Sequence, residues 1–223
     1  MAATPEPATR VRRIPELQRH DQRDLEAVLD AGLVAHVGIV DDAQPYVLPL
    51  AYVRDGDRLL LHGSTGSRLL RALAAGAPAC ATVTLIDGLV VARSAFESSM
   101  HYRCAMVFGR CAPVEDTEVA LQRFTDGLLP GRSGEVRASH PKELAATQVL
   151  ELPIERWSVK ASDEDPEDSE EDLAGDSWAG VLPIECRFGT PRPAADLRRG
   201  IPVPASVRQL AQRTITPPGT AAG

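Results

Sequence analysis

Aromatic side chains are scarce in this chain, since Phe, Trp and Tyr together account for only 4% of its 223 residues. A buried core therefore depends on Val, Leu, Ile and Ala, and the hydrophobic fraction of 43% is large enough to build one. Long apolar runs are also missing: none reaches the roughly 18 residues that cross a bilayer, and residues 1–7 contain no apolar signal-peptide segment. These absences predict a cytoplasmic protein without a membrane segment. The length of 223 residues suits one domain with tails, or one domain plus a small appendage.

Disulfide and metal-binding patterns are absent as well. The four cysteines form no Cys-x-x-Cys pair, which favours buried free thiols over disulfides or a zinc site. The five histidines show no His-x-x-x-His spacing, so no metal site is expected.

Acidic charge is concentrated in one place. The formal net charge is −7, but eight acidic residues lie within the ten positions 163–172. Without those eight, 24 basic residues stand against 23 acidic ones, so the rest of the chain is nearly neutral. This balance argues against a nucleic-acid-binding surface. The acidic run is expected to be a solvated, flexible loop, with a lid or a partner-binding segment as the alternative.

Short apolar segments separated by turn residues dominate the first two thirds of the chain. Strands are expected at 33–40, 45–53, 58–62, 79–87, 88–95 and 102–114, with Asp-Gly turns at 55–56 and 87–88. Helices are expected from about 21 to 31, 68 to 75 and 117 to 129. The pattern predicts a mainly β fold, an antiparallel barrel with peripheral α-helices, and excludes a doubly wound parallel sheet. The expected parts are a disordered tail (1–9), the barrel (10–160), the acidic loop (161–177) and a C-terminal wrapping segment and tail (178–223).

The segment Leu-His-Gly-Ser-Thr-Gly-Ser-Arg, residues 61–68, joins a predicted strand to a predicted helix. Small residues there let backbone N–H groups approach an anion, hydroxyls add donors, and Arg68 supplies a bidentate guanidinium. The spacing matches neither a Walker motif nor Gly-x-Gly-x-x-Gly. The segment is therefore either a phosphate-binding loop or a helix cap.

Four blocks, at 44–52, 61–68, 82–96 and 99–109, occur in an order and spacing that resemble a known family. This family is the FMN-binding split barrels related to pyridoxamine 5′-phosphate oxidase, and the chain is most similar to its nitroimidazole-resistance-type branch. The resemblance implies a six-stranded antiparallel split barrel of Greek-key type. It also implies a homodimer with flavin mononucleotide (FMN) at the subunit interface.

The resemblance also implies a set of site residues. Ser64, Ser67 and Arg68 would hold the phosphate, and 47–49 and 82–84 would lie along the flavin ring. Arg93, if it does not point to solvent, would complete the anion site with Ser94. Trp178 either packs in the core or an interface, or covers the flavin from the partner subunit. The full set of expected cofactor-binding residues is Val47, Leu48, Pro49, His62, Gly63, Ser64, Ser67, Arg68, Thr82, Val83, Thr84, Arg93, Ser94 and Trp178.

His62 is the expected catalytic residue, because the resembling branch has a functional histidine near the cofactor; the alternative is a hydrogen-bonded residue that shapes the turn. Leu69 follows Arg68 where the pyridoxamine oxidases have Lys, which disfavours their reaction. The predicted function is therefore a flavin-dependent oxidoreductase that reduces a small electrophile, such as a nitro compound, with NAD(P)H. The alternatives are a flavin-binding protein without turnover, and haem or deazaflavin binding on the same barrel, with His62 or His101 as the haem ligand.

Overall fold

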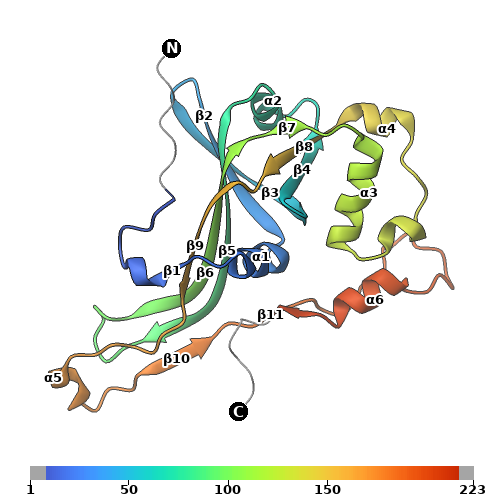
Figure 1. The fold of residues 1–223 in the computed structure, drawn as a ribbon. Helices are drawn as coiled ribbons and strands as arrows, with labels where there is room; N and C mark the ends of the chain where they lie inside the picture. Colours follow the sequence, from blue (N-terminus) through green and yellow to red (C-terminus); the bar gives the residue numbers. More distant parts are fainter. Residues whose placement is uncertain (1–8, 216–223) are drawn as a thin grey trace.

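The molecule is built around one antiparallel β-sheet that curls into a barrel, seen in a computed structural model that describes residues 9–215 (Figure 1). The sheet order is β1-β9-β6-β5-β2-β3-β4-β8-β7, and β10 pairs with β5. Its strands are β1 (Gln18–Arg19), β2 (Val34–Asp41), β3 (Gln44–Asp55), β4 (Arg58–Ser64), β5 (Pro78–Val91), β6 (Ser99–Arg110), β7 (Ala112–Pro113), β8 (Thr147–Pro153), β9 (Arg156–Ser162) and β10 (Gly180–Pro183). The expected mainly β split barrel is confirmed.

The split lies between β8 and β9. These strands follow one another in the chain, but β8 pairs with β4 whereas β9 pairs with β6. The two strands therefore connect the two halves of the barrel.

The α-helices lie outside the sheet (Figure 1). They are α1 (Gln22–Ala31), α2 (Arg68–Ala74), α3 (Thr117–Leu128), α4 (Pro141–Ala146), α5 (Glu170–Leu173) and α6 (Ala205–Ala211), with short 3-10 turns at Pro15–Leu17 and Arg132–Glu135. Helix α5 is at the far end of the β5–β6 hairpin (Figure 1). Asp21 caps α1 and Asp116 caps α3 by accepting backbone N–H bonds. No helix within residues 9–215 is both long and apolar enough to span a membrane.

The core is aliphatic, as the scarcity of aromatics requires. Leu59 and Leu61 of β4 are completely buried and pack with α2 and β8 residues such as Leu73 and Leu152. Tyr52 is the one aromatic among the most deeply buried described side chains, and its hydroxyl donates to the Leu29 carbonyl at 2.5 Å. This bond ties α1 to the sheet.

The predicted turn at Asp87-Gly88 is wrong. Strand β5 runs through both residues, with only a shift of register between Ile86 and Gly88. Asp87 is held by a two-point ion pair with Arg103, both contacts at 2.8 Å. A Cβ on Gly88 would stand 3.1 Å from the Leu182 carbonyl oxygen, so glycine here permits the close approach of β10.

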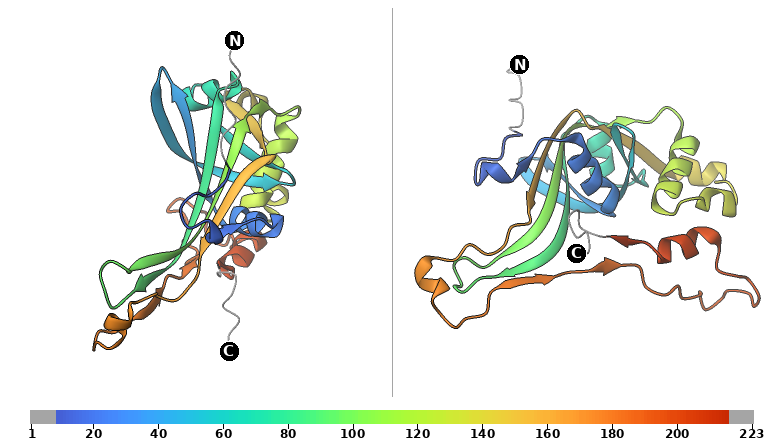
Figure 2. Two further views of the ribbon diagram at one scale, coloured as in Figure 1. Left: turned by 60° about the vertical axis from the view of Figure 1, so that its left-hand side comes forward. Right: turned by 60° about the horizontal axis from the view of Figure 1, so that its bottom comes forward.

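Because β5 and β6 are continuous, their hairpin extends well beyond the barrel (Figures 1 and 2). We call this hairpin beyond residue 86, together with the segment 163–184 that runs beside it, the arm. From the arm, the chain returns below the barrel to α6 (Figure 2). There Ser206 donates from its backbone N and its hydroxyl to Glu135, at 3.1 and 2.5 Å.

The remaining segments complete the comparison with the expected layout. The expected tail at 1–9 and the last residues, 216–223, lie outside the described part except for Thr9. A small second sheet pairs β11 (Cys186–Arg187) with β12 (Thr214–Ile215). The cysteines are free thiols as expected, but only Cys111 is buried and Cys186 is exposed. Burial raises the pKa of the Cys111 thiol to about 12.

Candidate functional site

In the loop between β4 and α2, the backbone N–H groups of Thr65, Gly66 and Ser67 form hydrogen bonds within the protein. The N–H of Gly66 donates to the Ser64 hydroxyl at 3.2 Å, and the N–H of Thr65 donates to the Ala146 carbonyl at 3.1 Å. Ser67 is the N-cap of α2, with its hydroxyl accepting from Leu70 at 3.4 Å. Helix capping, the alternative considered from the sequence, is therefore what Ser67 does in this structure. The available charge of the loop is that of Arg68.

Arg68 lies on the surface beside the β2–β3 turn. Its Nε donates to Asp41 at 2.6 Å, and its guanidinium carbon lies 5.2 Å from the centre of the Tyr46 ring. More than half of the side chain, 55%, is exposed. Nearby Asp41 raises the pKa of the guanidinium further above its ordinary value. An incoming phosphate would therefore compete with Asp41 for a cation that an aromatic ring already orients.

The strands next to Arg68 present an outward-facing, partly apolar surface. Val47 of β3 is 57% exposed, Pro49 is exposed beside it, and Thr82 and Thr84 of β5 face the same way. We call this surface the open face. Leu48 packs against the core and Val83 is buried within it, because side chains alternate along a strand. Of the two predicted triplets, only the outer members thus offer side chains to a ligand.

His36 also belongs to the open face, and sequence reasoning missed it. It pairs across the sheet with Pro49 on one side and Thr82 on the other, and its side chain is exposed. The signal was present, because His36 is a polar residue in an apolar strand at a position that alternates with buried Ala35 and Val37.

His62, near the end of β4, lies against α3. Its ring stands 4.2 Å from that of Phe124, at an angle of 56°. The Nδ1 atom is buried and has no hydrogen-bond partner among the residues that the structure describes. Desolvation by this burial lowers the pKa of the imidazole, which is therefore neutral at neutral pH. The alternative of a histidine hydrogen-bonded to shape the turn does not describe the Nδ1 seen here.

Arg93 and Ser94 lie in the arm, at the opposite end of the sheet from α2 (Figure 1). Arg93 binds Asp168 of the acidic run, and Ser94 accepts from the N–H of Glu97 at 3.2 Å. Within one chain, the structure therefore does not bring these two residues to Arg68. Trp178 is also in the arm and 67% exposed, whereas Trp157 packs against the core.

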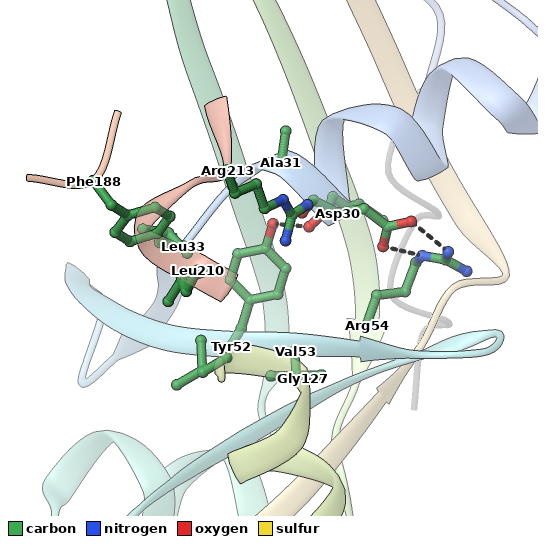
Figure 3. Close-up of a pocket in the computed structure, with 13 residues that line it drawn as sticks. Asp30, Ala31, Leu33, Tyr52, Val53, Arg54, Gly127, Phe188, Leu210 and Arg213 are labelled. Carbon is green, nitrogen blue, oxygen red and sulfur yellow. Dashed lines mark hydrogen bonds and ion pairs between the residues drawn. The ribbon is translucent and has the colours of Figure 1, made fainter. Parts of the chain in front are cut away.

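A small cavity of about 80 Å³ separates the barrel from the returning C-terminal segment (Figure 3). Its charged groups already satisfy one another: Arg54 forms a two-point ion pair with Asp30 at 2.7 and 2.6 Å, and Arg213 donates to the Asp30 carbonyl at 3.3 Å. The cavity is large enough for only a few water molecules. These contacts hold the C-terminal segment against the barrel and leave no free charged group for a ligand among the described residues that line the cavity.

A larger cavity, of about 410 Å³, opens beside the α2 loop. It is lined by Thr65, Arg71, Pro113, Val114, Thr117, Thr147, Gln148 and Val149. Thr65 belongs to the same loop as Arg68, so this cavity and the Arg68 site meet at that loop. Sequence reasoning did not identify it, because its walls come from three separate stretches of the chain, 65–71, 113–117 and 147–149.

The barrel and the split between its halves define the class of split barrels related to pyridoxamine 5′-phosphate oxidase. The family model described as pyridoxamine 5′-phosphate oxidase matches residues 21–161, and the chain belongs to this family. A comparison with curated proteins gives no match.

Two solved structures are similar over nearly their whole length. The FAD and heme binding protein from Mycobacterium smegmatis is 44% identical, with a TM-score of 0.87, over 90% of this chain and 100% of that one. The flavocytochrome Anf3 from Azotobacter vinelandii is 40% identical, with a TM-score of 0.85, over 91% of this chain and 95% of that one.

A more distant structure comes from Bacteroides thetaiotaomicron and is provisionally assigned to 5-nitroimidazole antibiotic resistance. It is 23% identical, with a TM-score of 0.54, over 64% of this chain and 85% of that one. At this identity the likeness extends to the fold alone.

Proposed function

We propose that this protein is a flavocytochrome that binds flavin adenine dinucleotide (FAD) and haem. The observation that carries the proposal is identity of 44% to a protein named for binding FAD and haem, and of 40% to one named a flavocytochrome, over 90% and 91% of this chain. FAD replaces the FMN expected from the sequence. Both flavins share the ring and the first phosphate, so the same residues serve either one.

The open face and Arg68 suit the shared part of a flavin. Val47 and Pro49 offer a flat apolar surface, and the hydroxyls of Thr82 and Thr84 lie beside it as hydrogen-bonding groups. Arg68, beside the β2–β3 turn where it contacts Asp41 and Tyr46, supplies the positive charge that a phosphate needs. The residues present therefore fit the cofactor.

His62 is the described histidine best suited to bind a haem iron. His101 uses its Nε2 on the Glu164 carbonyl at 2.8 Å, His140 begins α4, and His20 is exposed. His62 is half-buried and neutral, and its Nδ1 has no hydrogen-bond partner within residues 9–215. A neutral imidazole is the form that ligates iron. His36 is the second candidate, because it is exposed on the open face.

Haem loading of two matched histidine variants tests this assignment. We expect His62→Ala to lose the Soret band of the haem-loaded protein while still binding flavin. His36→Ala is expected to keep the Soret band. Loss of the band in His36→Ala alone would move the ligand to the open face, and an unchanged band in both variants would contradict an axial histidine at either position.

The proposed activity is oxidoreduction with NAD(P)H as the electron donor. Flavin and haem together exchange hydride and single electrons, and the protein binds and orients them. Anaerobic addition of NADH or NADPH is expected to bleach the flavin absorbance. A protein that only binds flavin would stay oxidised, which separates the two functions. Reduction of a nitro compound is a prediction that rests on the sequence resemblance.

We also propose a homodimer in which a second copy covers the open face. Phe96 at the end of the arm is 91% exposed, and Trp178 is 67% exposed. Large aromatics exposed to this degree favour a partner surface. Light scattering is expected to give a dimer, and flavin affinity is expected to fall in Trp178→Ser if this residue covers the partner's flavin. A monomer that binds flavin with unchanged affinity would exclude the shared site.

A further inference from the structure

The cavity beside the α2 loop combines a cation with hydroxyl groups and an apolar wall. Arg71 projects from α2 one turn after Arg68 and forms no ion pair with any described residue. Thr65, Thr117 and Thr147 contribute hydroxyls, and Gln148 contributes an amide. Pro113, Val114 and Val149 form the apolar part of the wall. This mixture matches a nucleotide, which needs a cation for phosphate, polar groups for ribose and an apolar surface for the base.

The position of the cavity suggests which nucleotide it takes. Its wall includes Thr65, and the proposed site of the flavin phosphate is at Arg68, three residues further along the same loop. If the first phosphate of a ligand is bound at Arg68, the part of the ligand beyond that phosphate has only the loop between β4 and α2 to cross before it reaches the cavity. FMN ends at that phosphate, whereas a dinucleotide continues.

The charges around the cavity indicate an orientation. Glu115, Asp116 and Glu118 flank Thr117, so the α3 side is unfavourable for phosphate. Arg71 is on the α2 side, nearer Arg68 in the chain. The volume of about 410 Å³ lies in the range of roughly 300–1,000 Å³ that is common for small-molecule sites.

We infer that this cavity holds the adenosine monophosphate half of a flavin dinucleotide, with Arg71 on the second phosphate and the adenosine towards Thr117 and β8. The inference rests on the proposed flavin binding. The inference also explains why the protein would prefer FAD to FMN, because FMN has no adenosine monophosphate half to occupy the cavity.

The test compares dissociation constants of the apoprotein for FAD and for FMN, measured by quenching of flavin fluorescence. We expect Arg71→Ala to weaken FAD about tenfold and leave FMN unchanged, with Arg71→Lys in between. Arg71 is exposed, so its replacement is tolerated by the fold. Arg23→Ala, an exposed arginine on α1, is the matched control and is expected to change neither constant.

The possible results are distinguishable. Equal weakening of both flavins would overturn the inference and assign Arg71 to the shared phosphate. Unchanged FAD and FMN affinities would overturn it and leave flavin binding intact. Failure of the wild type to bind either flavin would overturn the proposed function, and this inference with it.

Adenosine monophosphate itself provides a second measurement that needs no variant. It is expected to compete with FAD and to bind alongside FMN, since the two then occupy adjacent sites. Competition with FMN, or no competition with FAD, would contradict a separate adenylate site.

Discussion

Arg93 and Asp168 join the tip of the β5–β6 hairpin to the acidic run through two contacts. The backbone N–H of Arg93 donates to one carboxylate oxygen at 2.7 Å, and its guanidinium donates to the other at 2.8 Å. The Asp168 side chain is 0% exposed, although seven other acidic residues surround it in the sequence. One member of a strongly charged segment is therefore a buried anchor.

Asp168→Asn is expected to loosen the arm while leaving the barrel folded. Removing one partner of a fully buried pair costs about 3–5 kcal/mol, and we expect about 2 kcal/mol here because Arg93 is 29% exposed. Hydrogen exchange is the measurement: amides in 88–101 and 163–177 should exchange faster. Asp165→Asn, at an exposed position of the same run, is the control. Equal exchange in both variants would show that the anchor does not hold the arm.

Tyr52 predicts a specific loss of stability at alkaline pH. Burial, and then the charge of Asp30, raise the pKa of the phenol well above its ordinary value of 10.0. The unfolded chain releases this proton near pH 10, whereas the folded chain retains it. The stabilising contribution is therefore complete below pH 10 and is lost as the pH rises towards the folded pKa.

Urea unfolding as a function of pH measures this effect. Tyr52→Phe is expected to be about 1 kcal/mol less stable at neutral pH, because the bond to Leu29 is lost. Its stability should also fall less steeply above pH 10. Parallel alkaline slopes for the wild type and Tyr52→Phe would contradict the assignment.

Gly127 marks a close contact between α3 and β3. A Cβ there would stand 2.3 Å from Cγ1 of Val53, so Gly127→Ala is expected to destabilise the fold by about 1–3 kcal/mol despite the better helix propensity of Ala. Gly134→Ala, with nothing within 4 Å of its Cβ, should change stability by less than about 0.5 kcal/mol. The measurement is thermal unfolding. The double variant Gly127→Ala, Val53→Ala should recover part of the loss, and no recovery would exclude this contact as the cause.

Glu143 at the start of α4 is predicted to titrate at unusually low pH. Hydrogen bonds from Arg137 and from the His140 backbone lower the pKa of its carboxyl to about 2. The carboxylate therefore keeps these bonds until the pH falls well below the ordinary value of 4.5. NMR titration of the carboxyl carbon should give this midpoint, and Arg137→Gln should raise it. A midpoint near 4.5 in the wild type would contradict the contact.

Two Asp-Gly pairs show how far local sequence signals predict the fold. At 55–56 the pair forms the expected hairpin turn, with φ +66° at Gly56. At 87–88 the same dipeptide lies inside a strand, because Arg103 pairs with Asp87 and β10 packs over Gly88. Both partners are distant in sequence. The dipeptide itself predicts a turn from local sequence. The long-range contacts that override this prediction at 87–88 cannot be recognised from the local sequence.

In the candidate site, too, the features that depend on local sequence were predicted, and those that depend on long-range contacts were not. The family blocks predicted the Arg68 loop and the strands of the open face, whose alternation is a local property. The sequence did not predict that Arg93 would meet Asp168, 75 residues away, or that His62 would lie against Phe124. The cavity of Arg71 and Thr147 also depends on tertiary contacts, and no motif marks it.

The most direct test of the proposed function is the identity of the chromophores released when the purified protein is denatured. We predict FAD in the soluble fraction, separated from FMN by chromatography, together with haem identified by its pyridine complex. Protein that releases neither cofactor, and binds neither FAD nor haem when they are added, would contradict the account.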